Sequence, residues 1–320
     1  MAKTAVGMNA FEKIIESIQE KQSFILEAGA GSGKTHTLIQ TVNYLLDNHS
    51  DDLFEKGQKI ACITFTNVAK DQIIERTGGN ELVLAKTIHE FLWESIANFQ
   101  MQLHPKLEEL NKYYNDNRKS YNYIENLEEE IINKNITYWD YGRKLLEGKI
   151  THEDVLLLSN FMFRDFHKLS QLLADKYPFL FVDEYQDTEL ETIELLIDYH
   201  LLRNSSKLIL GFFGDSMQKI YNKGIGKIPP KYIDDNTLNF ITKEENFRSS
   251  IRVINLLNKI RTNLTQKPQT ENQGQVSFIY NCSDFEDGLS FINENKLLNI
   301  NSDYKSLFLT HRKKKKKNGF

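Results

Sequence analysis

Residues 28–35 read Ala-Gly-Ala-Gly-Ser-Gly-Lys-Thr, the spacing of a phosphate-binding loop, after the apolar run 24–26 and before a helical pattern. Glycines allow several backbone N–H groups to approach phosphate oxygens closely. Lys34 then reaches the β and γ phosphates, and the Thr35 hydroxyl is a ligand for Mg²⁺. The alternative is a glycine-rich turn before an ordinary helix. We expect the cradle itself to consist of Ala28, Gly29, Ala30, Gly31, Ser32 and Gly33.

A second set of chemical groups comes directly after the apolar run 179–182. Such a run suits a strand buried on both faces of a parallel sheet, and its carboxyl end faces the same crevice as the loop. Asp183 is expected to hold the Mg²⁺ that bridges the β and γ phosphates, and Glu184 to deprotonate the attacking water. Adjacent acidic residues are often only a solvated pair, but the Gln186 and Asp187 that follow favour the chemical interpretation.

The phosphate loop and the acidic pair can lie at one crevice only if the strands before them belong to one parallel sheet. The sequence has the apolar runs that such a sheet needs. These runs alternate with helical stretches, which is typical of an α/β fold with helices packed on the sheet. A chain of 320 residues is long for one core, so two or more units are expected. The strands are expected near 23–27, 58–64, 82–86, 179–183, 207–213 and 238–242.

The run Val182-Asp-Glu-Tyr-Gln-Asp-Thr188 resembles motif II of the UvrD/Rep/PcrA family of superfamily 1 DNA helicases. Four further segments resemble motifs Ia, Ib, III and IV in the family's order: Thr64-Phe-Thr-Asn67, Thr87-Ile-His89, Gly214-Asp-Ser-Met-Gln218 and Glu245-Asn-Phe-Arg-Ser249. The resemblance covers residues 24–250. It implies a P-loop NTPase fold, in which a RecA-like parallel sheet carries a helical insertion called 1B and a second RecA-like domain follows.

The same resemblance implies an ATP site with Mg²⁺ as cofactor. Gln218 would sense the γ phosphate or its water, and Arg248 would neutralise charge in the transition state, so both join Glu184 as catalytic residues. Phe247 stands at the position that stacks on adenine in the family. His36 stands where relatives usually carry an arginine on the other face of the base. The upstream glutamine by which the family reads adenine is absent, so the preference for adenine is inferred from the resemblance alone.

Single-stranded DNA is the partner that the resemblance implies. Phe65 is the best candidate for stacking on a base, although a phenylalanine that follows an apolar strand can also belong to the core. After Gln218 the family's tryptophan is missing, whereas Tyr221 is retained. The residues expected at DNA are Phe65, Thr66, Asn67, Thr87, His89 and Tyr221.

The first RecA-like core, 1A, is expected over residues 1–100 and 151–265, interrupted at 101–150 by 1B, where apolar positions recur at helical spacing without a strand signal. Residues 275–320 resemble an incomplete start of the second domain, 2A, with a lysine-rich tail at 313–317. Since no segment matches motifs V or VI, we expect a truncated product or completion by a separate polypeptide or accessory subunit. The tyrosines and basic residues of 1B could form a DNA-binding face, but the favoured interpretation is that most of the tyrosines pack in the small subdomain and the lysines are solvated. These residues are Lys112, Tyr113, Tyr114, Arg118, Lys119, Tyr121 and Tyr123.

The composition, with 40% hydrophobic and 26% charged residues, is that of a soluble globular protein. No apolar stretch has the length of a membrane span and the N-terminus lacks a secretory signal, so no membrane partner is expected. The two cysteines, Cys62 and Cys282, have no metal-site neighbours and indicate free thiols in a reducing cytoplasm. The net charge of −4 excludes a uniformly basic nucleic-acid binder, so DNA would have to bind in a local groove.

The sequence thus predicts an ATP-dependent DNA helicase or translocase of the UvrD type, which in its complete form moves 3′ to 5′ on single-stranded DNA and hydrolyses ATP at the cleft between 1A and 2A. Two alternatives stay open. One is a nucleotide-gated DNA-binding or signalling module, and the other is a fragment that binds ATP without unwinding. A P-loop enzyme that acts on a substrate other than nucleic acid, such as a kinase, is disfavoured by the Gln186 and Gln218 motifs.

Overall fold

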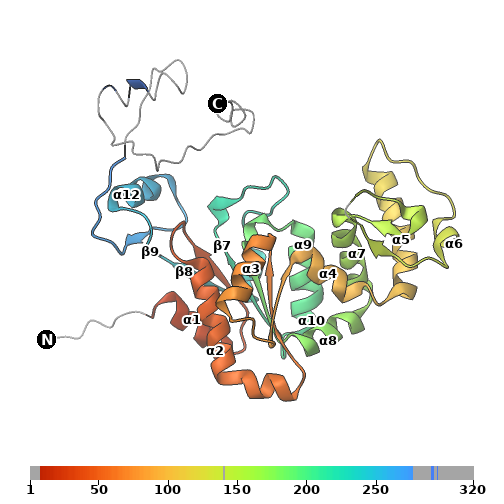
Figure 1. The fold of residues 1–320 in the computed structure, drawn as a ribbon, viewed down its shortest axis with the longest axis horizontal. Coiled ribbons are helices and arrows are strands. Elements are labelled where there is room, and N and C mark those ends of the chain that lie inside the picture. The colour runs from red at the N-terminus through yellow and green to blue at the C-terminus, as the bar shows by residue number, and fades with distance from the viewer. Residues whose placement is uncertain (1–7, 140, 277–289, 292–293, 295–320) are drawn as a thin grey trace. The chain divides into compact units, whose positions relative to one another are not determined.

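Six parallel strands form one sheet in the order β3-β2-β6-β7-β1-β8 (Figure 1). The computed structural model describes residues 8–139, 141–276, 290–291 and 294, and the chain divides into two compact units, 1–273 and 274–320. Every strand of the sheet overlaps a range expected from the sequence, which confirms the α/β class with a parallel sheet of the RecA-like P-loop type. The strands are β1 (Phe24–Ala28), β2 (Ile60–Thr64), β3 (Val83–Thr87), β6 (Phe179–Asp183), β7 (Ile209–Gly214) and β8 (Asn239–Lys243).

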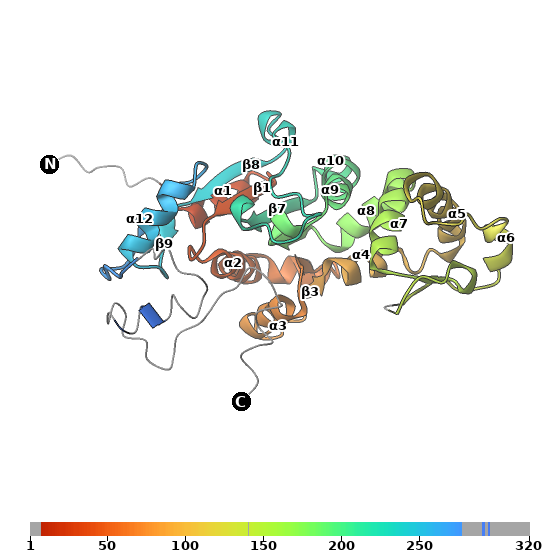
Figure 2. The same cartoon turned by 90° about the horizontal axis from the view of Figure 1, so that it is seen from above.

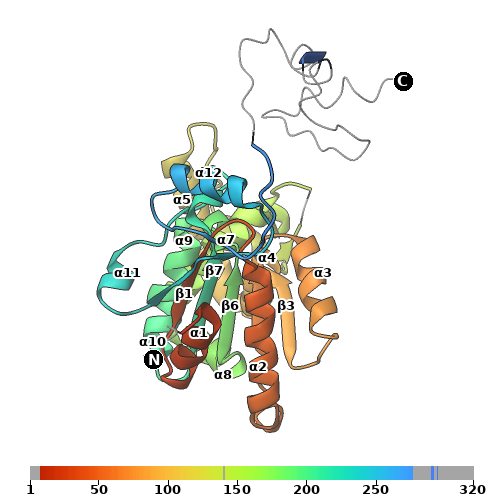
Figure 3. The ribbon, with the colours of Figure 1, turned by 90° about the vertical axis from the view of Figure 1, so that its left-hand side faces the viewer.

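Helices cover both faces of this sheet, because alternate residues of each strand point to opposite sides. Phe24 and Leu26 of β1 belong to one buried cluster, whereas Ile25 between them belongs to the other. Figure 3 shows α2 running along the sheet. The first cluster includes side chains of α1 (Ala10–Gln19), α2 (Lys34–Glu55) and α3 (Asn67–Arg76). The second includes side chains of α4 (Ile88–Ile96), α7 (His152–Asp165), α8 (His167–Lys176), α9 (Leu190–Glu194) and the π-helical turn η3 (Leu195–Leu201), which α10 (Leu202–Asn204) continues.

The segment between α4 and α7 lies beyond α7, on the side away from β1 and β8 (Figure 2). The prediction that this segment lacks strands is wrong in one detail, since two short strands pair in parallel through the Thr137 and Trp139 N–H groups. Strands of two residues are too short to leave a period in the sequence. That 101–150 is a separate domain stays a prediction. Its elements are α5 (Gln100–Asn117), α6 (Leu127–Ile131), β4 (Thr137–Tyr138), η1 (Leu145–Glu147) and β5 (Lys149–Ile150).

Tyr114 fixes α5 against the start of α7. Its ring is fully buried and its hydroxyl donates to the buried carboxylate of Asp154 at 2.6 Å. Asp154 also closes the capping box that begins α7 at Thr151. Tyr121 is half-buried and donates to Asn111 at 2.8 Å. The packing interpretation is therefore confirmed for Tyr114 and Tyr121.

Short elements follow the strands near the carboxyl edge of the sheet. The pair β9 and β10 is parallel and joins the segment after β8 to the segment after α12. The expected start of 2A and the lysine-rich tail lie almost wholly outside the described residues. In the part of the chain that the structure describes, no helix is long and apolar enough to cross a membrane. These remaining elements are η2 (Tyr185–Asp187), η4 (Ser216–Gln218), α11 (Lys231–Asp234), β9 (Glu245–Asn246), α12 (Ile251–Ile260) and β10 (Lys267–Pro268).

Candidate functional site

The loop 28–35 joins the carboxyl end of β1 directly to α2, which begins at Lys34. Gly31 and Gly33 have φ of +78° and +82°, a region that favours glycine. A Cβ on Gly29 would lie only 2.3 Å from the side-chain nitrogen of Gln266. The loop therefore needs glycine for its turn at Gly31 and Gly33, as a phosphate cradle at a helix N-terminus does, and at Gly29 the missing side chain leaves room for Gln266.

Lys34 and Glu184 meet across the carboxyl edge of the sheet. The Lys34 Nζ lies 2.8 Å from the Glu184 Oε2, and the Gln186 Nε2 donates to the same oxygen at 2.7 Å. Glu184 has a φ of +52°, which for a residue other than glycine costs about 1–3 kcal/mol and persists mostly at functional sites. The local backbone thus holds this carboxylate at the crevice in a strained conformation.

Asp183 lies next to Glu184 but is buried at the end of β6, where it accepts hydrogen bonds from the Thr35 hydroxyl and the Glu184 N–H. Burial, and then the charge of Glu184, raise the pKa of the Asp183 carboxyl to about 7. A divalent cation would favour the charged form of this group. Because Mg²⁺ prefers oxygen ligands, the Thr35 hydroxyl and the Asp183 carboxylate fit the metal site that the sequence predicts.

A cavity of about 460 Å³, within the usual size range of ligand pockets, opens over the phosphate loop and is lined by Lys34, Thr35 and Glu184. Its wall includes His36, Gln218 and Arg248, so three more of the expected nucleotide residues lie around the loop. Gln72 and Arg76 of α3 also line it. The sequence analysis missed these two, because an exposed glutamine and a terminal arginine suit any surface helix.

Asn246 connects the expected motif IV to the loop. Its buried side chain donates to the Ala30 carbonyl at 2.7 Å and accepts from the Arg248 and Ser249 N–H groups at 3.1 and 2.9 Å. The adjacent Phe247 N–H donates to the Gly31 carbonyl at 3.2 Å, while the Phe247 side chain is 61% exposed. Asn246 was missed as a site residue, although it is part of the segment that resembles motif IV.

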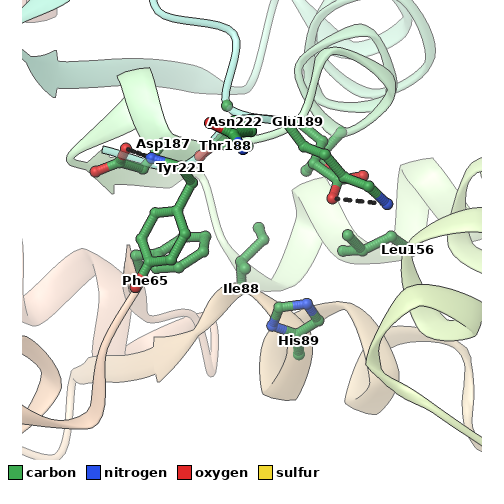
Figure 4. Close-up of a pocket in the computed structure, with 12 residues that line it drawn as sticks. Phe65, Ile88, His89, Leu156, Asp187, Thr188, Glu189, Tyr221 and Asn222 are labelled. Carbon is green, nitrogen blue, oxygen red and sulfur yellow. Dashed lines mark hydrogen bonds and ion pairs between the residues drawn. The ribbon is translucent and has the colours of Figure 1, made fainter. Parts of the chain in front are cut away.

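A second cavity, of about 200 Å³, lies at the same edge of the sheet and has mainly apolar walls (Figure 4). The rings of Phe65 and Tyr221 lie with centroids 4.5 Å apart, and Ile88 and His89 form another part of the wall. Phe65 is only half-buried, so it does not belong to the core. The structure thus brings together three of the six residues expected to contact DNA, namely Phe65, His89 and Tyr221.

Thr66 and Thr87 have a local structural role. Each is the N-cap of the helix that follows, with its hydroxyl accepting from the Ala69 N–H at 3.2 Å and the Glu90 N–H at 3.3 Å. Asn67 is exposed in the first turn of α3. A DNA contact for these three residues stays a prediction.

Comparison with known proteins supplies a family and several relatives. Residues 12–223 match the sequence model of a family described as AAA domain. The Gabija protein GajB of Bacillus cereus (strain HuB5-5) is 29% identical over 332 residues, which cover 78% of this chain and 48% of that protein. The ATP-dependent DNA helicase PcrA of Staphylococcus epidermidis (strain ATCC 12228) is 26% identical, over 83% of this chain and 43% of that protein. The chain therefore spans about half the length of these curated relatives.

Among solved structures, unliganded Pif1 from Bacteroides sp. matches with a TM-score of 0.33 and 14% identity. The match covers 82% of this chain and 47% of the other.

Proposed function

Since the chain belongs to the AAA domain family and the predicted resemblance to superfamily 1 helicases is confirmed by its relatives, we propose that it is the ATP-binding part of a DNA helicase or translocase. One observation carries the proposal. Lys34, Asp183 and Glu184 come from two strand ends far apart in the sequence, yet their charged groups meet beside the phosphate loop. Phosphoryl transfer from a nucleoside triphosphate requires this set of cation, metal ligand and base.

The ion pair between Lys34 and Glu184 suggests how binding and hydrolysis are coupled. In the structure Lys34 neutralises the carboxylate that we assign as the base. Lys34 must turn toward the β and γ phosphates when ATP binds, which leaves Glu184 free to accept a proton from water. Mg²⁺, held by Thr35 and Asp183, would neutralise phosphate charge.

The charge that develops on the transferred phosphoryl group needs further cations. Arg248 is held beside the loop by Asn246, and Arg76 faces the same cavity from α3. We assign both to phosphate oxygens, because a guanidinium can donate two parallel hydrogen bonds to them. Gln218 lies on the same wall and would sense the γ phosphate or the attacking water.

We assign the second cavity to single-stranded DNA. Its charged wall residues are Lys223, Asp187 and Glu189, so its net charge does not favour a phosphate. The ring pair of Phe65 and Tyr221 suits a base, whose flat face stacks on aromatic side chains. By resemblance, movement is 3′ to 5′, with a second RecA-like domain or a separate polypeptide closing over the ATP.

The test uses the full 320-residue chain in three assays. A fluorescent ATP analogue should bind in the presence of Mg²⁺, single-stranded DNA should stimulate phosphate release, and a 3′-tailed duplex reports unwinding. Absence of nucleotide binding would disprove the proposal. Binding and hydrolysis without strand displacement would instead favour a nucleotide-gated DNA-binding module, which is the second candidate because Ile220, in the segment where the family's tryptophan is missing, is 76% exposed and offers no aromatic platform.

A further inference from the structure

A buried group of charged side chains lies beside the nucleotide cavity and has no part in the chemistry proposed above. Glu27 lies in β1, Asp215 follows β7, and Arg261 follows α12; they are 2%, 0% and 9% exposed. The two terminal nitrogens of Arg261 donate to the two carboxylate oxygens of Asp215 at 2.7 and 2.8 Å. This is the bidentate geometry in which an arginine fixes both the place and the plane of a carboxylate.

Glu27 completes the group with four hydrogen bonds. Its carboxylate accepts from the Tyr185 hydroxyl at 2.5 Å, from the Ser216 N–H and hydroxyl at 3.0 and 2.6 Å, and from the Asn263 side chain at 2.8 Å. These partners come from the segments after β6, β7 and α12. Glu27 therefore ties the strand that carries the phosphate loop to the three segments that surround Asp215.

The charged state of Asp215 depends on Arg261. Burial alone would raise the pKa of the Asp215 carboxyl, but the hydrogen bonds from Arg261 and Gln218 and the charge of Arg261 outweigh burial and lower it. Removal of one partner of a buried pair leaves an uncompensated charge, which is strongly destabilising for the arrangement around it. Without Arg261, Asp215 would have to take up a proton or turn away.

Asp215 in turn holds the residues assigned to hydrolysis. Its carboxylate accepts the Gln218 side-chain N–H, so it sets the direction of that side chain. Its backbone N–H donates to the Gln186 Oε1 at 3.0 Å, and the Gln186 Nε2 donates to the Glu184 Oε2 at 2.7 Å. Consecutive contacts thus lead from Arg261 to Gln218 in two steps, and to Glu184 in three.

We propose that Arg261 is a positioning residue of the nucleotide site, which fixes Asp215 and through it Gln218 and Gln186. The catalytic meaning of this inference rests on the proposed function, whereas the positioning itself does not. An arginine is required because lysine, with a single ammonium, cannot bind both carboxylate oxygens in one plane. Among the residues that the structure describes, none forms a hydrogen bond with the Arg261 Nε, so the side chain is held through its two terminal nitrogens.

Hydrogen exchange of the full chain without nucleotide tests the positioning directly. In Arg261→Met, backbone amides of residues 214–218 should exchange faster, while those of β6 and the middle of α2 keep their protection. The matched control is Arg203→Met, since Arg203 also donates from both terminal nitrogens, but to the Phe163 and Arg164 carbonyls. Unchanged exchange at 214–218, or faster exchange spread equally over β6 and α2, would overturn the proposal. Arg261→Lys keeps the charge and should show the same local effect if the methionine variant does not fold.

ATP turnover then tests the link to Gln218. We expect Arg261→Met to lower turnover about tenfold or more with less than about threefold change in nucleotide affinity, the pattern of an interaction that matters only during reaction. In a Gln218→Ala background the same substitution should lower turnover by a smaller factor than in the parent chain, because the part of its effect that passes through Gln218 is already lost and only the part through Gln186 remains. If the double variant lost turnover by the full product of the two single-variant factors, the two residues would act independently, and the proposal would be overturned. If the unaltered chain neither binds nor hydrolyses ATP, the proposed function fails, and the exchange experiment alone decides the positioning.

Discussion

The two cavities at the carboxyl edge of the sheet are built from different chemistry. Around the phosphate loop, an ion pair and hydrogen bonds fix the charged groups of Lys34 and Glu184 and the backbone of the loop. Around Phe65 and Tyr221, apolar walls and one ring pair leave the ligand free to lie in several ways. Charge recognition requires defined residues at defined distances, whereas stacking requires only a flat ring. The first cavity should therefore respond to single substitutions far more strongly than the second.

The largest effect is expected at the assigned base. Glu184→Gln should retain binding of Mg²⁺ and ATP, because Thr35 and Asp183 are unchanged, but lower hydrolysis by roughly 10²–10⁴-fold through loss of general-base catalysis. Single-turnover phosphate release measures this loss, and titration with a fluorescent ATP analogue measures the binding. Equal hydrolysis by variant and parent would show that another group takes the proton.

Loss of the cation that pairs with Glu184 should come next. Lys34→Ala removes a nearly buried ammonium facing the phosphates and should weaken ATP binding by about 2–4 kcal/mol, the usual cost of truncating one partner of a desolvated charge pair. Lys56→Ala is the matched control, since Lys56 ends α2 in solvent with only a 4.0 Å ion pair. Titration with a fluorescent ATP analogue measures the affinity. If the Lys34 variant bound the analogue as tightly as the parent chain, the assignment of residues 28–35 as a phosphate-binding loop would be wrong.

Stability without metal should depend on pH through Asp183. Its folded pKa of about 7 lies above the unfolded value, so the folded state binds more protons between about pH 4 and pH 7 and loses stability as pH rises through this window. Asp183→Asn should abolish this dependence and raise the free energy of unfolding at pH 8 by up to about 4 kcal/mol. Urea unfolding in EDTA at pH 5 and pH 8 checks this, and parallel pH profiles for variant and parent would contradict it.

The smallest effect belongs to the apolar cavity. Phe65→Ala should weaken binding of single-stranded DNA by about 1–3 kcal/mol, the usual contribution of one stacked base. It should leave ATP binding unchanged, because Phe65 does not line the nucleotide cavity. Phe54→Ala, at a 68% exposed phenylalanine near the end of α2, is the control. Fluorescence anisotropy with a labelled oligonucleotide measures the DNA affinity of both variants. If the Phe65 variant bound DNA as tightly as the parent chain, Phe65 would have no role in DNA binding.

Local sequence predicted the sheet and the loop well, for a physical reason. Six runs of about strand length preceded polar groups, and the four central strands β1, β2, β6 and β7 are buried at nearly every residue, which requires apolar side chains on both faces. The loop glycines and Lys34 were predictable because a phosphate cradle restricts the backbone within a few residues. The strands β4 and β5 were missed because two residues are too few for a period.

What the sequence by itself determined is which groups can do chemistry and on which strand ends they stand: Lys34 and Thr35 follow β1, Asp183 ends β6 and Glu184 comes directly after it. What only the tertiary structure decided is how these groups are held. Asn246 reaches the Ala30 carbonyl 216 positions away, and Arg261 reaches Asp215 across 46 positions. Such contacts depend on which strands become neighbours in the sheet and where the segments after them fold back. Periodicity reports only neighbours along one helix or strand, so it carries no signal for them.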